Sequence, residues 1–325
     1  MPEPEPGGAD AAAPFVAVVG AGPAGLMAAE VLSRAGLAVT VFDRMPTAGR
    51  KLLMAGRGGL NLTHSEPLPG FLARYEPPTP RLAAAVEAFP PSALRSWADG
   101  LGQETFVGSS GRVFPRGLKA SPLLRAWLAR LDAQGVRLRL RTEWTGWDDT
   151  GALRLRGEAG EVEALRPAAT LLALGGASWP RLGSNGAWAA VLAASGVAVT
   201  PLAPANCGFE VAWSTVFAER FAGQPVKAVA ASSDAGTVQG EFVVTRSGIE
   251  GSLVYAHAAA LRDALERDGT AALMLDLAPG RSAERIASDL ARVGGKESFS
   301  NRLRKGAGLD GIRTALVREF STPAE

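Results

Sequence analysis

The sequence predicts an α/β protein in which a parallel β-sheet covered by helices is followed by a β-rich and helical region. Near the N-terminus, two short apolar runs flank an apolar helix, as in a βαβ unit with buried parallel strands. From about residue 201, short apolar pieces alternate with turn residues, which is typical of antiparallel strands. The 325 residues are 47% hydrophobic, enough for one large domain with an insertion or for two domains.

Three segments are expected. Residues 1–13 are rich in Pro, Gly and Ala with acidic side chains between them, which predicts a flexible tail. Residues 14–200 form the expected nucleotide-binding domain. Residues 201–325 form the expected β-rich and helical domain, which we interpret as an insertion that contacts the substrate.

The first domain begins with the βαβ unit. Residues 15–19 predict a buried strand, residues 24–35 a helix that stops at Gly36, and residues 38–42 a second strand followed by Asp43. The connections are short, so the two strands are expected to lie parallel in one sheet.

The remaining elements follow in chain order. In the first domain we expect a helix over 81–101 broken at Pro90 and Pro91, an amphipathic helix over 121–134, strands over 136–140 and 153–155, and a second central strand over 168–174. In the second domain we expect strands over 207–211, 226–231, 240–245 and 271–277, a helix over 254–267, and helical pieces from 282 to 320. The Arg-rich stretch 302–305 is expected to be a solvated face and not an RNA-binding site.

The composition excludes several classes of chemistry. Cys207 is the single cysteine, so no disulfide forms within the chain and cysteine-based zinc or iron–sulfur sites are excluded. With only His64 and His257 besides, no metal site is expected, and an organic cofactor is expected to carry the chemistry. We expect Cys207 to be a small buried side chain. The net charge of +2 predicts no nucleic-acid partner.

Residues 11–29 carry no charge, nearly the length of a membrane span. The stretch contains prolines and glycines, and acidic rather than basic residues precede it, unlike a signal peptide. We therefore expect a soluble, cytoplasmic protein with no membrane contact.

The strongest motif is a GxGxxG sequence formed by Gly20, Gly22 and Gly25 directly after the first strand. In this context Gly20 permits a tight turn, Gly22 lets the backbone approach a pyrophosphate, and Gly25 permits close helix–strand packing. The N-terminus of the following helix stabilises the anion. Asp43, after the second strand, is placed to accept hydrogen bonds from an adenosine ribose. A strand–turn–helix with incidental glycines remains the alternative.

The segment 49–64 is rich in glycine and basic side chains. Because glycine disfavours helix, we expect a functional loop without helical structure. Arg50, Lys51 and Arg57 are candidate contacts for phosphate or for the cofactor, with solvated loop cations as the alternative reading.

Several motifs together resemble the BaiN/YhiN-type NAD(P)/FAD-dependent oxidoreductases. They are Gly49-Arg50-Lys51, the segment 56–64, Gly111-Arg112-Val113-Phe114-Pro115, the segment 175–180, Gly183-Ser184-Asn185-Gly186 and the segment 247–251. The resemblance implies a Rossmann-like FAD/NAD(P)-binding domain and FAD as cofactor. The expected cofactor-binding residues are Gly20, Gly22, Pro23, Ala24, Gly25, Asp43, Arg44, Gly49, Arg50, Lys51, Gly56, Asn61, Gly175 and Gly176.

The chain departs from the family pattern in two places. Leu60 stands where the family has a loop cysteine and His64 where it has an asparagine, so thiol redox chemistry at this loop is excluded and the flavin alone is expected to react. His64 is a weak catalytic candidate, with a structural or solvent-facing role as the alternative. The family's closing C-terminal segment, with a Gly-Gly-Tyr-Asn-like run, has no counterpart here, so we expect this chain to bind FAD weakly or incompletely.

The resemblance implies an FAD-dependent oxidoreductase that transfers a hydride between the flavin and a small organic substrate. No second GxGxxG motif follows a strand, so NAD(P)H is expected at most as a transient reductant. Two alternatives stay open: a flavoprotein that acts on RNA, and a catalytically inactive nucleotide-binding or scaffold protein. The sequence leaves the oligomeric state undetermined.

Overall fold

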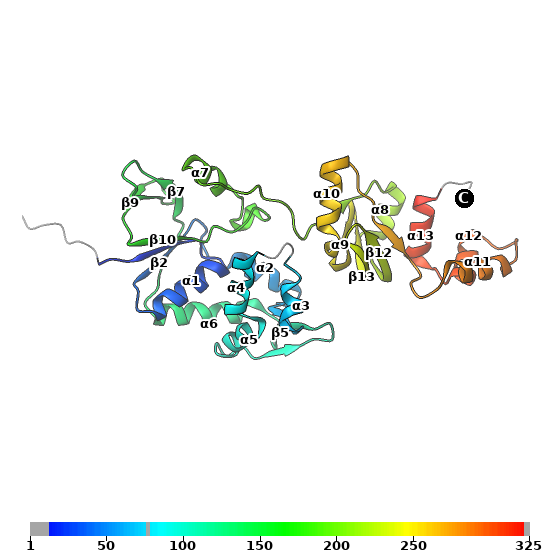
Figure 1. Ribbon diagram of the computed structural model, residues 1–325, viewed down its shortest axis with the longest axis horizontal. Helices are drawn as coiled ribbons and strands as arrows, with labels where there is room; N and C mark the ends of the chain where they lie inside the picture. Colours follow the sequence, from blue (N-terminus) through cyan, green and yellow to red (C-terminus); the bar gives the residue numbers. More distant parts are fainter. Residues whose placement is uncertain (1–12, 76–78, 322–325) are drawn as a thin grey trace, which may run out of the picture. The chain divides into compact units, whose positions relative to one another are not determined.

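The computed structural model describes residues 13–75 and 79–321, which form two compact units, one ending at Leu202 and the other beginning at Ala203 (Figure 1). The sequence-based boundary between residues 200 and 201 lies two residues from this division. The predicted tail, apart from its last residue, lies outside the described residues.

The first unit is built on a parallel sheet. Its strands are β1 (Val16–Val19), β2 (Val39–Asp43), β6 (Arg137–Leu140) and β10 (Ala169–Leu172), in the order β10-β1-β2-β6. In register, Val16 lies opposite both Val39 and Ala169. Helix α1 (Pro23–Arg34) connects β1 to β2, so the predicted βαβ unit is confirmed.

Alternation along the strands places two different layers on this sheet (Figure 1). Val18 and Val41 pack with helix α1 and helix α6 (Ala120–Ala133) in one core cluster. Ala17 and Phe42 pack in a second cluster with an antiparallel sheet formed by β7 (Glu143–Trp147), β8 (Leu153–Arg156) and β9 (Val162–Leu165). Adjacent side chains of one strand thus pack against different layers, because successive side chains of a β-strand point to opposite faces of the sheet.

A buried carboxylate joins three helices of the first unit. Glu30 on α1 accepts hydrogen bonds from the indole Nε1 of Trp97 (3.0 Å) and of Trp127 (2.7 Å), and from Nη1 of Arg130 (3.0 Å). Trp97 lies on α5 (Pro91–Asp99), and the other two donors lie on α6. Glu30 is 1% exposed, and these three donors satisfy a charge that burial would otherwise penalise heavily.

Two sequence-based expectations for the first unit are wrong. The segment 49–64 is not helix-free, because it contains α2 (Arg50–Ala55) and the 3-10 turn η1 (Gly56–Gly58). Gly49 and Gly56 cap the ends of α2, so its interior holds only helix-compatible residues. The run 168–174 was expected to be a central strand. Among the strands that the structure describes, however, β10 pairs with β1 alone and is the terminal strand of the sheet order.

The remaining elements of the first unit surround this framework. The predicted break at Pro90 and Pro91 is confirmed, since separate helices α4 and α5 flank it. The other elements are α3 (Leu68–Leu72), α4 (Pro80–Ala88), a small antiparallel sheet β3-β5-β4 of β3 (Thr63–His64), β5 (Arg112–Pro115) and β4 (Thr105–Val107), the turn η2 (Pro180–Leu182) and α7 (Trp188–Ala194).

The second unit is organised around an antiparallel sheet in the order β11-β14-β13-β12-β15, which confirms the predicted antiparallel character. The strands are β11 (Phe209–Glu210), β12 (Pro225–Ser233), β13 (Gly236–Thr245), β14 (Gly248–Glu250) and β15 (Met274–Asp276). The predicted helix over 254–267 is instead two helices, α9 (Ser252–Ala256) and α10 (Ala258–Asp268), divided at His257. Cys207, expected to be buried, is half-buried.

Helices complete the second unit. Helix α8 (Thr215–Phe221) contributes Phe217 and Phe221 to the core that also contains Phe242 and Leu253. The chain then continues through α11 (Ala283–Arg292), α12 (Phe299–Arg302), the π-helical turn η3 (Leu303–Ala307) and α13 (Gly311–Phe320). Among the helices that the structure describes, none combines the length and apolar character needed to cross a membrane.

Candidate functional site

A cavity of about 370 Å³ lies in the first unit at the carboxyl ends of β1 and β2, the edge where open α/β sheets bind ligands. Ten of the fourteen predicted cofactor-binding residues line it: Gly20, Gly22, Pro23, Ala24, Asp43, Arg44, Gly49, Arg50, Lys51 and Gly175. The fold therefore brings together residues that are up to 155 positions apart in the chain.

The three glycines of the motif meet three different constraints. Gly20 has a φ of +111°, and a Cβ there would lie 2.2 Å from the carbonyl oxygen of Ala173. A Cβ on Gly25 would lie 1.8 Å from the carbonyl oxygen of Gly20, so only glycine allows α1 to approach β1 this closely. At Gly22 the Cβ position is open space beside the cavity. Only Gly22 leaves room that a ligand would use.

The N-terminus of α1 meets the cavity at Gly22, which is its N-cap and provides no side-chain cap. Pro23 occupies the first helical position and has no N–H, and the first bond within the helix joins the N–H of Leu26 to the carbonyl of Gly22. The N–H groups of Ala24 and Gly25 therefore have no acceptor in the helix. This end of α1 carries the positive pole of the helix dipole and can stabilise an anion.

Asp43 ties the second strand to the glycine turn. Its Oδ2 accepts a hydrogen bond from the N–H of Ala21 at 2.7 Å, and its Oδ1 accepts one from the N–H of Met45 at 2.7 Å. A carboxylate has about four lone-pair sites, so each oxygen retains acceptor capacity. Since Asp43 also lines the cavity, it can accept hydrogen bonds from ligand hydroxyls while it holds the turn in place.

The start of α2 forms a second side of the cavity. Gly49, with a φ of +66°, donates its N–H to the carbonyl of Ala21 at 2.8 Å, so the start of α2 lies beside the glycine turn. Arg50 donates through Nη1 to the Thr47 hydroxyl at 3.2 Å, and Nζ of Lys51 lies 3.4 Å from the Ser178 hydroxyl. Both cations line the cavity.

Two buried polar atoms of cavity-lining residues lack a hydrogen-bond partner in the described part of the chain. They are Nε of Arg50 and the indole Nε1 of Trp144. Buried donors are nearly always paired in native proteins, because an unpaired one loses its hydration without compensation. A polar ligand in this cavity would supply the missing acceptors, and the phosphate, ribose and ring oxygens of a dinucleotide fit that requirement.

The opposite wall carries charged and aromatic side chains. Arg44 donates through Nη2 to the carbonyl of Gly183 at 2.8 Å, and Glu143 pairs with both Arg44 and Arg156. The indole Nε1 of Trp188 donates to the carbonyl of Gly175 at 3.1 Å.

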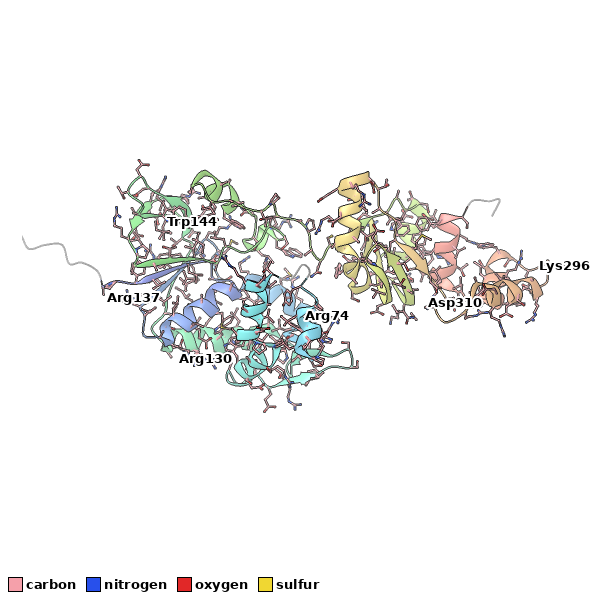
Figure 2. All side chains as sticks on the ribbon, viewed as in Figure 1. Arg74, Arg130, Arg137, Trp144, Lys296 and Asp310 are labelled. Carbon is pink, nitrogen blue, oxygen red and sulfur yellow. The ribbon has the colours of Figure 1, made fainter. Side chains whose placement is uncertain are left out.

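Trp144, labelled in Figure 2, packs edge-on against Trp147 with ring centroids 5.0 Å apart. It belongs to a core cluster, and it also lines the cavity.

Four predicted cofactor-binding residues lie outside the cavity lining: Gly25, Gly56, Asn61 and Gly176. A Cβ on Gly56 would lie 2.5 Å from the Cβ of Ala120, so this glycine permits close packing against α6. With its amide nitrogen facing the backbone carbonyls, Asn61 donates to Thr63 at 2.8 Å. Gly56 and Asn61 thus have local structural partners.

His64 also lies outside the cavity lining. Its Nε2 lies 3.0 Å from the carbonyl oxygen of Ser110, and its Nδ1 accepts the N–H of Glu66 at 3.2 Å. Nδ1 also lies 3.3 Å from the carboxylate oxygen Oε1 of Glu66. Both ring nitrogens therefore have partners within this loop region, an arrangement that favours the structural alternative over the catalytic one.

Several residues that line the cavity were absent from the sequence-based set. Thr142, Glu143, Trp144 and Thr145 lie at or next to β7, a strand that was not predicted. Arg156 lies at the end of β8. A strand that follows β6 after a two-residue connection is the local signal that would have found them. Among the described residues, no group of His, Cys, Asp and Glu side chains is arranged to hold a metal ion.

Comparisons with known proteins give a family match over most of the chain and a relative that aligns with a short part of it. A family model described as "HI0933-like protein Rossmann domain" matches residues 14–316. A ribosomal RNA dihydrouridine synthase from Haemophilus influenzae is 43% identical over 60 residues, which is 18% of this chain and 15% of that protein. The chain thus aligns with well under two thirds of this relative.

The solved structures to which the chain is similar include three of low sequence identity. THI4 from Thermovibrio ammonificans has a TM-score of 0.38 at 16% identity, covering 64% of this chain and 70% of that one. An open conformation of a flavocytochrome c3 fumarate reductase has a TM-score of 0.41 at 17% identity, covering 66% and 47%. BexE has a TM-score of 0.38 at 21% identity, covering 81% and 52%.

Proposed function

This chain belongs to the HI0933-like family, and on that basis we propose that it binds FAD in the cavity of the first unit and works as an FAD-dependent oxidoreductase. The membership confirms the predicted Rossmann-like domain and the predicted resemblance to the BaiN/YhiN-type oxidoreductases. The observation that carries the proposal is the meeting of an open Gly22, an uncapped α1 N-terminus and Asp43 in one cavity.

Each wall of the cavity suits one part of the dinucleotide. The N–H groups at the start of α1 suit the pyrophosphate, because the helix dipole and the lack of a side chain at Gly22 favour an anion there. Asp43 suits the ribose hydroxyls as an acceptor. The same carboxylate would repel a ribose 2′-phosphate, which disfavours NADP in this cavity. Arg50 and Trp144 supply buried donors for polar atoms of the ligand.

FAD supplies hydride chemistry when it is bound, and the protein's part is to bind and orient it. The described cavity lining contains no histidine and no cysteine, so it offers neither an imidazole nor a thiol beside the ligand. We therefore propose hydride exchange between the flavin and a small organic substrate. NAD(P)H is proposed as the reductant, and the cytoplasm as the compartment.

Flavin reduction tests this proposal directly. The purified chain, reconstituted with FAD under anaerobic conditions, is mixed with NADH or with NADPH, and the visible absorbance of the flavin is followed. Bleaching by either nucleotide, reversed by a substrate, supports the oxidoreductase. Binding of FAD with no reduction by any donor would instead favour a catalytically inactive nucleotide-binding protein.

The alignment with the ribosomal RNA dihydrouridine synthase favours a second candidate function, reduction of a uracil base in RNA. This reaction adds one hydride and one proton across a carbon–carbon double bond of the base, and NAD(P)H oxidation balances it by way of the flavin. The test is dihydrouridine formation in RNA incubated with the reconstituted protein and NAD(P)H. Turnover of small substrates without any change in RNA would reject this second candidate.

A further inference from the structure

Positive charge is concentrated in one part of the second unit. We define the basic arm as residues 281–305, which comprise α11, α12 and most of η3. It contains seven basic and three acidic side chains, a net charge of +4, whereas the whole chain carries +2. Its basic side chains are Arg281, Arg285, Arg292, Lys296, Arg302, Arg304 and Lys305. The rest of the chain is therefore slightly acidic, and the overall net charge conceals a basic surface.

Two stretches far apart in the arm form one surface. Arg281 donates through Nη2 to Asp289 on α11 at 2.8 Å and to the carbonyl of Gly306 at 2.9 Å. A Cβ on Gly306 would lie 2.6 Å from Leu290, so the glycine permits α11 and η3 to pack closely. The stretch 302–305, expected to be a solvated face on its own, thus adjoins the arginines of α11.

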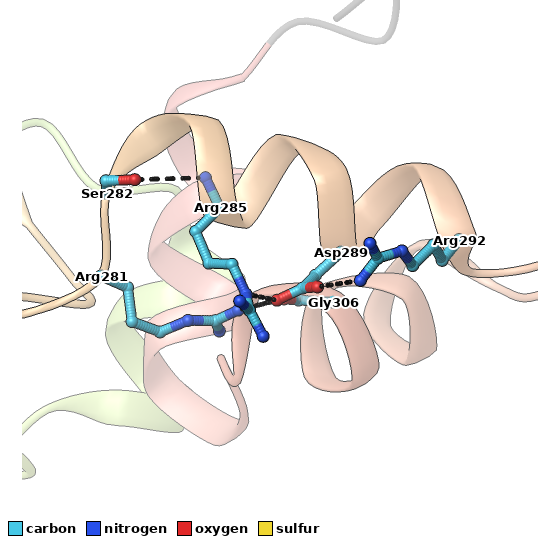
Figure 3. Close-up of polar contacts among 6 residues, drawn as sticks. All are labelled: Arg281, Ser282, Arg285, Asp289, Arg292 and Gly306. Carbon is cyan, nitrogen blue, oxygen red and sulfur yellow. Dashed lines mark hydrogen bonds and ion pairs between the residues drawn. The ribbon is translucent and has the colours of Figure 1, made fainter.

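Three arginines share a single carboxylate in this arm (Figure 3). Asp289 accepts hydrogen bonds from Arg281 (2.8 Å), Arg285 (3.1 Å) and Arg292 (3.2 Å). The hydrogen bond from Arg285 is the main cause that lowers the pKa of Asp289, so the carboxylate stays ionised and the group keeps a net charge of +2. The side chains of Arg285 and Arg292 are 70% and 72% exposed, and that of Asp289 only 21%.

The side chains of Arg285 and Arg292 are largely exposed, so each of their ion pairs with Asp289 contributes little to folding by itself. The exposed guanidinium groups have planar donor forks that match phosphate oxygens. Arg285 and Arg292 are seven residues apart on α11, a rise of about 10.5 Å, which suits a chain of phosphates better than a single one.

An exposed aromatic ring lies in the same arm. Phe299 on α12 is 39% exposed, and the guanidinium of Arg318 lies over its ring at 5.4 Å from the centroid. Cations beside an exposed ring are the combination with which proteins hold single-stranded nucleic acid, since every base can stack on the ring.

We propose that the basic arm binds the phosphate backbone of single-stranded RNA, with Phe299 as a stacking platform. This inference rests on the second candidate function, in which the protein acts on RNA. A membrane surface would require more exposed apolar area than the one phenylalanine of the arm provides.

Charge-removing variants test the proposal by fluorescence anisotropy with a labelled single-stranded oligouridylate and the full chain. R285Q/R292Q removes two exposed charges of the arm. R125Q/R154Q, the matched control, removes two exposed charges from the first unit. The arm variant should weaken binding, and its plot of log affinity against log salt should be shallower by about 1.4, at roughly 0.7 per phosphate contact. The control should bind like the unaltered protein.

Two further variants separate the contribution of unpaired cations from that of the aromatic ring. Within the described residues Lys296 and Arg304 form no ion pair, so K296Q/R304Q should weaken RNA binding without disturbing Asp289. F299A should lower the affinity by at least about fivefold and leave the salt dependence unchanged. Thermal melting confirms that each variant is folded.

Three results would overturn the proposal. They are no RNA binding by the unaltered chain, equal losses in the arm and control variants, or binding to phosphatidylserine vesicles without binding to RNA. Flavin content is measured on the same samples. Loss of FAD with RNA binding retained contradicts only the flavin proposal, whereas intact flavin with arm-independent RNA binding contradicts only the basic arm.

Discussion

The carboxylate of Asp43 accepts a hydrogen bond from the backbone N–H of Ala21 at 2.7 Å. Asp43 ends β2 and Ala21 lies in the glycine turn after β1, so this bond fixes the turn relative to the neighbouring strand. Because both residues line the cavity, one side chain organises the turn and presents acceptor atoms to a ligand.

Replacing Asp43 with Ala is expected to weaken FAD binding by roughly 10- to 100-fold. The glycine turn and the ligand hydroxyls both lose their acceptor, and hydrogen bonds to a charged group contribute about 1 to 3 kcal/mol. Quenching of flavin fluorescence measures the affinity. Asp149→Ala, at an exposed position outside the cavity lining, serves as the control. An unchanged affinity in Asp43→Ala would mean that the ribose does not lie at Asp43.

Substitution by alanine should affect the stability of the fold differently at two glycines of the motif. Gly25→Ala should lower the free energy of unfolding by more than about 2 kcal/mol, because its Cβ would lie 1.8 Å from a backbone oxygen. Gly22→Ala should leave the fold intact, because its Cβ enters open space. Urea denaturation compares them, and equal destabilisation would contradict the different constraints that we assign to these glycines.

Glu30→Ala should destabilise the first unit by about 3 kcal/mol, because two indole N–H groups and Arg130 lose their shared buried acceptor. Urea unfolding followed by tryptophan fluorescence reports the change directly, since Trp97 and Trp127 are the donors. Glu87→Ala on the exposed face of α4 is the control and should have an effect within about 0.5 kcal/mol.

The second unit should lose stability as the pH falls through the ordinary histidine range. Burial lowers the pKa of His257, which is 0% exposed, and its Nδ1 lies 2.8 Å from the Ser233 hydroxyl. Below about pH 6.5 the unfolded chain therefore binds a proton that the folded chain excludes, and stability declines until the pH passes the lower folded pKa.

The measurement is the free energy of unfolding between pH 7.5 and pH 5, taken as a rough working range around the histidine pKa. Substitution His257→Leu should flatten the decline in this window. A decline of unchanged size in the variant would assign the pH dependence to other groups.

The sequence predicted the fold best where a hydrophobic pattern and conformationally required glycines occur together. The apolar runs around Gly20 and Gly25 predicted the βαβ unit, because buried parallel strands and tight turns leave clear signals. The sequence did not indicate α2, because the number of glycines in a segment does not show whether Gly49 and Gly56 lie inside a helix or at its ends.

The aromatic wall of the cavity was missed for a different reason. Trp144 belongs to a strand that was not predicted, and only the tertiary fold shows that this residue lies in a core cluster and also lines the cavity. Likewise, the basic arm depends on packing between α11 and η3, which local sequence patterns do not reveal.

The measurement that tests the central claim most directly is a titration of the ligand-stripped chain with FAD, compared with Gly22→Val and Gly117→Val. Both positions have open space at the Cβ, but only Gly22 lines the cavity. We predict saturable binding in the unaltered chain and in Gly117→Val, and its loss in a folded Gly22→Val. Equal FAD binding by all three proteins, or none by the unaltered chain, would contradict the assignment of this cavity to FAD.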